Sequence, residues 1–337
     1  MFEVQKKEKK MAARLKTLFG HIQEHKTPTD VSTVLTHASP YTVSYKYTLN
    51  SPRLTEKQRQ FYEDYGYLVI KKLVPEYSLQ KYRERFEQIC KKEVVVPGLT
   101  IMRDVAISKD EFVPGQKAVT KIQNFQLDEE LFEYCKLPEV LDYVEAIVGS
   151  NIKAIHTMLI NKPPDPGRKT SRHPMHQDLH YFPMKPAEKI VCSWTAMQKV
   201  NRENGCLVVL PGTHKGKLLK HDYPEWEGGV NKMYHGVRDY DPSMPRSHLE
   251  MEAGDTVFFH PLLIHGSGMN RTKDFRKSIS CHYASSEIEF AEQDSQSTIS
   301  EELLDLVSKK FKVPRESIKY EDIWKIKSRT VKGRSDW

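Results

Sequence analysis

Residues 152–160 read IKAIHTMLI, and this alternation decides the fold class. Side chains two residues apart on a β-strand point to the same side, so the pattern predicts a strand with one apolar face. That face would carry Ile152, Ala154, His156, Met158 and Ile160. Further short strands are predicted at 190–197, 206–210, 255–260 and 277–283, separated by turn signals such as Asn204-Gly205 and Gly254-Asp255. This spacing favours a sandwich or barrel over a doubly wound sheet.

Helices are predicted on both sides of this β-rich region. Residues 55–58 form a T-x-x-Q capping box that opens a helix ending near Gly66, and a strand follows at 67–74. Pro75 opens a second helix that runs to Cys90, because apolar residues recur there at helical spacing. A third helix is predicted at 137–148, and the polar segment from about Ser300 also indicates helix. The sequence therefore predicts an all-β core with added helices.

The composition excludes several classes of protein. The chain has 337 residues, of which 38% are hydrophobic and 29% charged, as in ordinary globular proteins. No stretch approaches the roughly 18 uninterrupted apolar residues of a membrane helix, so no membrane span is expected. The cysteines are odd in number and never spaced C-x-x-C, which argues against a disulfide framework or a zinc ribbon and favours a reducing compartment. They are Cys90, Cys135, Cys192, Cys206 and Cys281.

The net charge of +7 is partly concentrated at the N-terminus. Residues 1–50 hold eight Lys or Arg against four Asp or Glu, so the remainder is only mildly basic. This charge fits either a solvated face or an anionic substrate. Nucleic acid is not an expected partner, because the chain contains no zinc finger, basic zipper or aromatic-basic RNA motif.

The segment His176-Gln177-Asp178 is a candidate metal-binding motif. On a strand, His176 and Asp178 would point to the same side and converge on one ion. One imidazole and one carboxylate, completed by a second imidazole, form the facial triad of non-haem iron(II) oxygenases, with positions left open for ligand and oxygen. An isolated H-x-D also occurs in surface turns, and His173 and His180 flank the motif as rival ligands.

His265 and Arg276 supply the missing parts of such a site. Residues 254–268 read GDTVFFHPLLIHGSG: a turn, a buried strand, and then His265 in the following loop. Such a loop would bring a second imidazole from across a barrel. Arg276, eleven residues later, is predicted on the next strand, where its guanidinium could hold a carboxylate bidentately. Each residue alone could have a purely structural role; together they indicate one iron site with a nearby carboxylate clamp.

With these residues in place, the chain resembles the iron(II)/2-oxoglutarate dioxygenases and, among them, the phytanoyl-CoA dioxygenase family. The resemblance runs from about Tyr65 nearly to the C-terminus, and three segments carry it most specifically: 171–183 (SRHPMHQDLHYFP), 204–215 (NGCLVVLPGTHK) and 256–268. It implies a double-stranded β-helix, the jelly-roll or cupin-like barrel, with N-terminal helices packed on one sheet. It also implies iron ligands at His176, Asp178 and His265.

The resemblance further implies the residues that contact 2-oxoglutarate. At some of these positions a structural role is also open: Trp194 and Met158 could be core residues, and Lys121 could extend to solvent. Gln177 lies between two metal ligands and should point away from them, which leaves it a role beside the site or toward the substrate. The implied cofactor-binding residues are Lys121, Met158, His176, Gln177, Asp178, Trp194, Ser267 and Arg276.

The activity implied by the resemblance is hydroxylation at carbon 2 of phytanoyl-CoA and other 3-methyl-branched acyl-CoAs, with Fe(2+), 2-oxoglutarate and O2. The products would be a 2-hydroxyacyl-CoA, succinate and CO2, within peroxisomal fatty acid alpha-oxidation, and L-ascorbate would keep the iron reduced. Two alternatives stay open: a family member with a different substrate, and a non-catalytic binding protein on the same fold. The intact triad and Arg276 argue against the second, because a scaffold does not need them.

Residues 14–22, RLKTLFGHI, resemble a type-2 peroxisomal targeting signal. On a helix, Arg14, Leu15, Leu18, His21 and Ile22 share one face that an import receptor could read. Ile22 departs from the usual Leu or Ala, and a disordered basic tail or a mitochondrial presequence is the alternative. We therefore expect a peroxisomal presequence at 1–30, a linker at 31–52, a dioxygenase domain at 53–337 and location in the peroxisomal matrix.

Overall fold

The structure, a computed structural model, describes residues 44–103, 119–167, 169–227, 229–291 and 298–334. The predicted targeting signal at 14–22 lies outside these residues. The compact unit that carries the site spans residues 45–337. Tyr47 at its start is buried, and its backbone N–H donates to a carboxylate oxygen of Glu63 at 2.8 Å. The end of the predicted linker therefore packs against the first helix of the unit.

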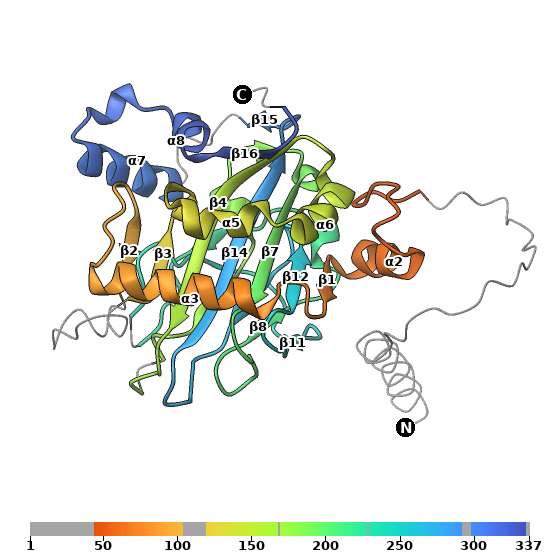
Figure 1. Cartoon of the computed structure of the whole chain (residues 1–337), viewed down its shortest axis with the longest axis horizontal. Coiled ribbons are helices and arrows are strands. Elements are labelled where there is room, and N and C mark those ends of the chain that lie inside the picture. The colour runs from red at the N-terminus through yellow and green to blue at the C-terminus, as the bar shows by residue number, and fades with distance from the viewer. Residues whose placement is uncertain (1–43, 104–118, 168, 228, 292–297, 335–337) are drawn as a thin grey trace, which may run out of the picture. The chain divides into compact units, whose positions relative to one another are not determined.

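A large antiparallel sheet forms one layer of the fold (Figure 1). Its long central strands pair over most of their length, and β16 adds to the edge of β4 near the C-terminus. These bounds confirm the strands predicted at 190–197, 255–260 and 277–283 to within one or two residues. In spatial order the strands are β1 (Tyr67–Ile70), β12 (Thr256–Phe259), β7 (Ile190–Ala196), β14 (Arg276–Ser285), β4 (Ile152–Lys162), β3 (Lys121–Gln123) and β2 (Thr100–Met102), with β16 (Arg329–Lys332) beside β4.

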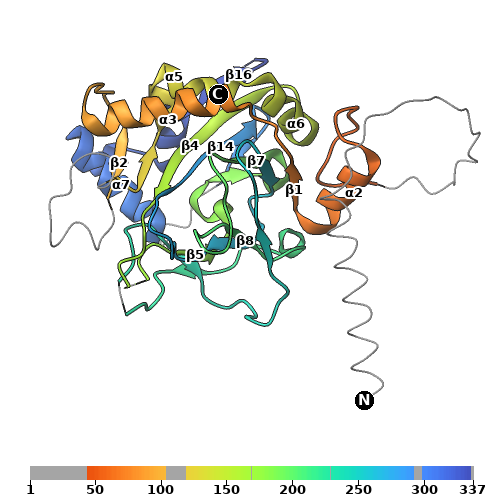
Figure 2. The same ribbon diagram turned by 60° about the horizontal axis from the view of Figure 1, so that its bottom comes forward.

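A smaller sheet packs against this layer, as Figure 2 shows for β5 and β8. Its order is β11 (Ser247–Leu249), β8 (Leu207–Val209), β13 (His265–Ser267) and β5 (His173–His176). Trp194 and Phe259 of the large sheet belong to one buried cluster with Leu207 and Val209 of the small sheet, so the two sheets share a core. Two short pairs complete the β-structure: β9 (His221–Asp222) with β10 (Gly236–Val237), and β6 (Met184–Lys185) with β15 (Glu289–Phe290).

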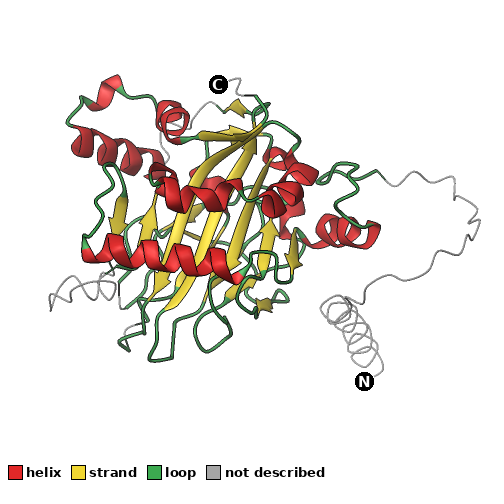
Figure 3. Cartoon of the chain, in the orientation of Figure 1, coloured by secondary structure: helices red, strands yellow, loops and turns green. Residues whose placement is uncertain are grey.

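Helices cover the outer face of the large sheet (Figures 1 and 3). They are α3 (Glu76–Lys91), α5 (Glu129–Lys136) and α6 (Pro138–Val148). Their apolar faces bury residues such as Phe86 and Val144 against the sheet, and the Tyr134 hydroxyl lies 2.8 Å from Oγ1 of Thr195 on β7. Helix α2 (Glu56–Tyr65) begins with the predicted capping box. The all-β core with helices on one sheet is thus confirmed.

The C-terminal part of the chain forms a separate helical pair, α7 (Thr298–Phe311) and α8 (Tyr320–Lys327). It confirms the helical character predicted from about Ser300. Short 3₁₀ helices join other elements: η2 (Phe125–Leu127), η3 (Asp178–Tyr181), η4 (Ala187–Lys189), η5 (Thr213–Lys215) and η6 (Arg315–Ser317). No helix among the described residues combines the length and apolar character needed to cross a membrane.

The alternation in β4 is interrupted, and this corrects the first expectation. Opposite the junction of His282 and Tyr283, the register of β4 skips Ile155, as in a β-bulge. An extra residue reverses the side to which the following side chains point. Ile152 and Ala154 consequently pack on the helix side of the sheet, whereas His156, Met158 and Ile160 line an internal cavity. The five residues do not share one face.

Candidate metal centre

The two sheets bring three predicted ligands together. His176 ends β5 and is the cross-strand partner of His265, which begins β13. The sequence placed His265 in a loop, but it pairs within the small sheet. Asp178 begins η3 rather than continuing β5; because Gln177 keeps an extended conformation (φ −116°, ψ 127°), Asp178 still points to the side of His176. All three side chains are buried.

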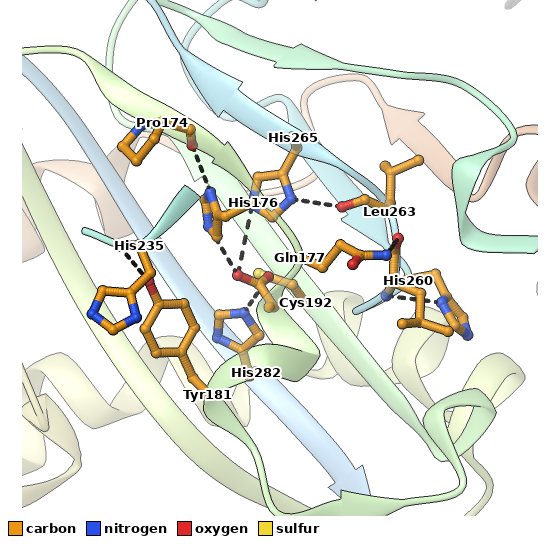
Figure 4. A network of polar contacts seen from close by, with 12 residues as sticks. Pro174, His176, Gln177, Tyr181, Cys192, His235, His260, Leu263, His265 and His282 are labelled. Carbon is orange, nitrogen blue, oxygen red and sulfur yellow. Dashed lines mark hydrogen bonds and ion pairs between the residues drawn. The ribbon is translucent and has the colours of Figure 1, made fainter. Parts of the chain in front are cut away.

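The ligand atoms of these residues converge on one point (Figure 4). Oδ1 of Asp178 lies 3.2 Å from Nε2 of His176 and 3.7 Å from Nε2 of His265, and the two imidazole rings are 4.2 Å apart between centres. One donor atom from each of the three side chains lies within 4.8 Å of the others. This arrangement has the size of a metal site with three protein ligands.

Hydrogen bonds orient both imidazoles for metal binding. Nδ1 of His176 lies 2.9 Å from the carbonyl oxygen of Pro174, and Nδ1 of His265 lies 3.0 Å from that of Leu263. A carbonyl only accepts, so each Nδ1 carries the proton and each neutral ring directs the Nε2 lone pair toward Asp178. The Nε2 lone pairs of the two histidines and the Asp178 oxygen face one another and repel, and a cation between them would remove this repulsion. The donor set fits iron(II), which suits imidazole and carboxylate ligands.

The electrostatics of the centre agree with this assignment. Burial lowers the pKa of His265 to about 4, which keeps the ring neutral at physiological pH. Desolvation pushes the pKa of Asp178 upward, but His265 and His282 outweigh it and hold the pKa well below its usual range. The cluster therefore presents the negative charge of Asp178 beside a neutral His265 ring.

His282 is a further neighbour of Asp178 that the sequence did not single out as functional. Its Nε2 lies 2.8 Å from Oδ2 of Asp178, the oxygen that does not face the other two histidines. His282 lies on β14, six residues after Arg276, so strand alternation places both on one face. That parity is a signal from which its position could have been inferred. The same reasoning applies to Cys192, which lies two residues before Trp194 on β7 and groups with Asp178 and His282.

A buried guanidinium lies further along the same face of β14. Arg276 is 2% exposed, and it donates to Gly205 O at 2.7 Å and to Oγ of Ser278 at 3.0 Å. Its Nε has no hydrogen-bond partner among the described residues, and the titratable neighbours that act on the guanidinium there are Cys206 and Tyr234, not a carboxylate. Burial lowers the pKa of Arg276 to about 10, which shows the cost of a desolvated charge. A buried guanidinium of this kind is suited to bind an anionic ligand.

One cavity of about 1180 Å³ connects the metal cluster with Arg276. The predicted contact residues Lys121, Met158, Trp194 and Ser267 all line it. Lys121 is buried, with its ammonium 4.6 Å from the ring centre of Tyr234, so it does not extend to solvent. Trp194 lies 5.4 Å from the Arg276 guanidinium and is also part of the core between the sheets.

Gln177 is not brought to the cavity. Its side-chain nitrogen donates to Leu262 O at 2.9 Å and to Lys217 O at 3.1 Å, and its oxygen accepts from the backbone of Leu219 at 2.8 Å. These three bonds tie loops together beneath the ligands, consistent with the expectation that Gln177 points away from them.

The rival ligands His173 and His180, and two further histidines, occupy other environments. His173 lines the cavity with its ring 4.4 Å from that of His176, but it belongs to no convergent ligand group among the described residues. His180 bonds His235 at 3.0 Å instead of facing Asp178. His214 and His260 lie 5.6 Å apart next to Tyr47, outside the cavity.

The fold and the buried centre together define a jelly-roll protein with a two-histidine, one-carboxylate cluster. Solved structures share this fold: the epimerase SnoN in complex with Fe3+, alpha ketoglutarate and nogalamycin RO aligns with a TM-score of 0.55 at 20% identity, covering 70% of this chain and 86% of that one. EctD from S. alaskensis with bound Fe aligns with a TM-score of 0.57 at 14% identity, covering 74% and 86%. The expected jelly-roll architecture is thereby confirmed.

Sequence comparisons identify the family. The family model for phytanoyl-CoA dioxygenase (PhyH) matches residues 62–278. The "Phytanoyl-CoA dioxygenase, peroxisomal" of Rattus norvegicus is 56% identical over 327 residues, covering 95% of this chain and 96% of the relative. The "Probable phytanoyl-CoA dioxygenase" of Caenorhabditis elegans is 55% identical over 300 residues, covering 86% and 96%. The chain belongs to the phytanoyl-CoA dioxygenase family.

Proposed function

We propose that this protein is an iron(II)- and 2-oxoglutarate-dependent dioxygenase that hydroxylates carbon 2 of phytanoyl-CoA and other 3-methyl-branched acyl-CoAs. The observation that carries the proposal is the convergence of His176, Asp178 and His265 in the cavity that also contains Arg276. Relatives named phytanoyl-CoA dioxygenase, similar over nearly their whole length, support the substrate.

The roles of the site residues follow from their positions. His176, Asp178 and His265 would hold iron(II), which with 2-oxoglutarate and oxygen supplies the oxidising chemistry. Arg276 would bind the distal carboxylate of 2-oxoglutarate, with Ser267 and Lys121 close to the same ligand. Trp194 and Met158 would form apolar walls that exclude water and fix its orientation. Gln177 would support the ligands from behind. L-ascorbate would maintain the reduced metal.

The location and the division of the chain are also part of the proposal. A peroxisomal location is supported by the names of the relatives, and the peroxisomal matrix fits a type-2 signal at 14–22 read by its import receptor. Residues 1–30 would then be a presequence, 31–52 a linker and 53–337 the dioxygenase domain. Import of a fluorescent protein fused to residues 1–30, abolished by His21→Ala, would test the signal.

The catalytic proposal has a direct spectroscopic test. Iron(II) and 2-oxoglutarate are added to the protein anaerobically, and a visible charge-transfer band is expected. The His176→Ala variant should lose the band, and release of succinate should depend on phytanoyl-CoA. A protein that gives no band, or a band that survives His176→Ala, would not be a dioxygenase of this kind. If the protein turned over another substrate and not branched acyl-CoAs, the proposed chemistry would stand and the proposed substrate would be wrong.

A further inference from the structure

The cavity continues beyond the metal cluster into an apolar groove. One wall comes from β2 and η2, and the other from α7, α8 and the segment between them. At about 1180 Å³ the whole cavity exceeds the roughly 300–1,000 Å³ of ordinary small-ligand sites, so it has room for more than 2-oxoglutarate. We use the name apolar groove for the part lined by Ile101, Leu127, Leu306, Val313 and Ile326.

Several residues of the apolar groove expose large apolar surfaces to water. Ile326 is 84% exposed, Leu127 47%, Ile101 45% and Val313 37%. Half of the exposed large hydrophobic side chains in the described part of the chain thus lie at this one mouth. Exposed apolar side chains gathered at a concave surface are typical of a binding groove. Their burial by a ligand would be favourable.

The walls of the apolar groove are fixed to each other and to the metal cluster. Nζ of Lys310 on α7 donates to Gly98 O, before β2, at 2.8 Å, which joins the two walls. The Tyr320 hydroxyl on α8 donates to Tyr181 O at 2.8 Å, and Tyr181 belongs to the same 3₁₀ helix as Asp178. These hydrogen bonds connect the walls of the apolar groove to each other and to the segment that carries Asp178.

The inner end of the apolar groove is polar. Nζ of Lys327 lies 3.4 Å from Nδ1 of His156 and 4.2 Å from the ring centre of Trp324. Burial lowers the pKa of Lys327 to about 7. The ring of His156 is 5.7 Å from that of His282, which in turn bonds Asp178. The lining thus changes from apolar to polar as it approaches the metal cluster, which suits an amphipathic ligand.

We infer that the apolar groove binds the branched hydrocarbon chain of the acyl-CoA substrate, with the thioester at its inner end beside His156 and Lys327. This inference rests on the proposed function. It explains why carbon 2, next to the thioester, is presented to the metal while the saturated chain is carried away from it. The carbon-rich lining favours the chain as occupant over the phosphate-bearing nucleotide of coenzyme A, which would gain nothing from Ile326.

The test compares binding of acyl-CoAs of graded chain length, from acetyl-CoA to phytanoyl-CoA, to metal-free protein by calorimetry. Ile326→Asp and Ile101→Asp should weaken binding of the long chain by about tenfold or more, because each puts a charge where the hydrocarbon would be buried. Acetyl-CoA should bind these variants as it binds the wild type. Val95→Asp is the matched control, since Val95 is 78% exposed but lies outside the cavity.

Two outcomes would overturn the inference. Equal weakening for all chain lengths would place coenzyme A, not the chain, in the apolar groove; unchanged affinities would leave it without a role in substrate binding. Because binding is measured without metal, this result is independent of the charge-transfer band with iron(II) and 2-oxoglutarate. Absence of that band in the wild type would refute the proposed chemistry. If only the groove variants then bound long acyl chains more weakly, the apolar groove would still be identified as the site of the chain.

Discussion

The two oxygens of the Asp178 carboxylate have different partners, because Nε2 of His282 lies 2.8 Å from Oδ2 while Oδ1 faces His176 and His265. The hydrogen bond occupies one oxygen and leaves the other for the metal. Groups that orient a metal ligand in this way commonly change affinity by 10–100-fold when removed. His282 is therefore expected to position Asp178 without contacting the ion.

Replacing His282 by leucine should lower iron(II) affinity by roughly 10–100-fold. His282→Gln, which retains a donor, should recover part of the loss. Competition with a chromophoric chelator under anaerobic conditions measures both. His156→Leu is the control, since His156 adjoins His282 but does not bond Asp178. Equal affinities in the leucine and glutamine variants would contradict a positioning role.

Substitution of Arg276 should separate ligand binding from stability. Arg276→Leu is expected to weaken 2-oxoglutarate binding about tenfold or more, because a charge-assisted hydrogen bond contributes roughly 1.5–3 kcal/mol. The thermal midpoint of the ligand-free protein should stay the same or rise, since a desolvated charge without a carboxylate partner is removed. Calorimetry with 2-oxoglutarate and thermal unfolding provide the two readouts. Unchanged 2-oxoglutarate affinity would rule out the clamp.

The protein should lose stability as the pH falls below about 6.5. Burial lowers the pKa of His214 to about 4 and that of His260 to about 3, so the unfolded chain binds protons that the folded chain does not. At pH 5 each histidine should reduce the free energy of unfolding by about 2 kcal/mol. His260→Asn should flatten the dependence of urea unfolding on pH between 6.5 and 4. Desolvation also lowers the pKa of the more exposed His248, so His248→Gln should flatten the dependence less than His260→Asn does. Equal slopes in the two variants would contradict the prediction.

Asp255 should contribute strongly to stability despite its distance in sequence from its partner. It is 1% exposed, and its carboxylate accepts from Lys71 Nζ and from the backbone of Lys72, both at 2.8 Å. Asp255→Ala should lower the free energy of unfolding by about 1–3 kcal/mol, because the backbone N–H groups of Lys72 and Glu252 lose their charged acceptor. Glu252→Ala, which removes an exposed pair with Lys199, should cost under about 1 kcal/mol. Comparable losses in chemical denaturation would argue against this difference.

The sequence predicted which segments form helices and strands better than it predicted which side of the sheet each strand residue faces. The segment 277–283 could be predicted as a strand because its apolar residues Ile279, Cys281 and Tyr283 alternate with polar ones. His176, Asp178 and His265 could be grouped because their residue types suit one ion. The bulge at Ile155 could not be foreseen, since it depends on pairing with β14 across more than a hundred residues. The pairing of His265 with His176, and the contact of His282 with Asp178, depend on the same kind of distant register.

The bulge in β4 has a consequence for redesign of the protein. Positions 156, 158 and 160 face the cavity and can be varied to change which substrate is accepted, whereas positions 152 and 154 belong to the core beneath the helices. Deleting Ile155 would remove the extra residue itself, so Ala154 and His156 would become neighbours in a regular ladder and both sets would keep their present faces. A single-residue deletion there should thus leave the substrate contacts in place, because Ile155 does not line the cavity, and its cost should come from the loss of a buried side chain.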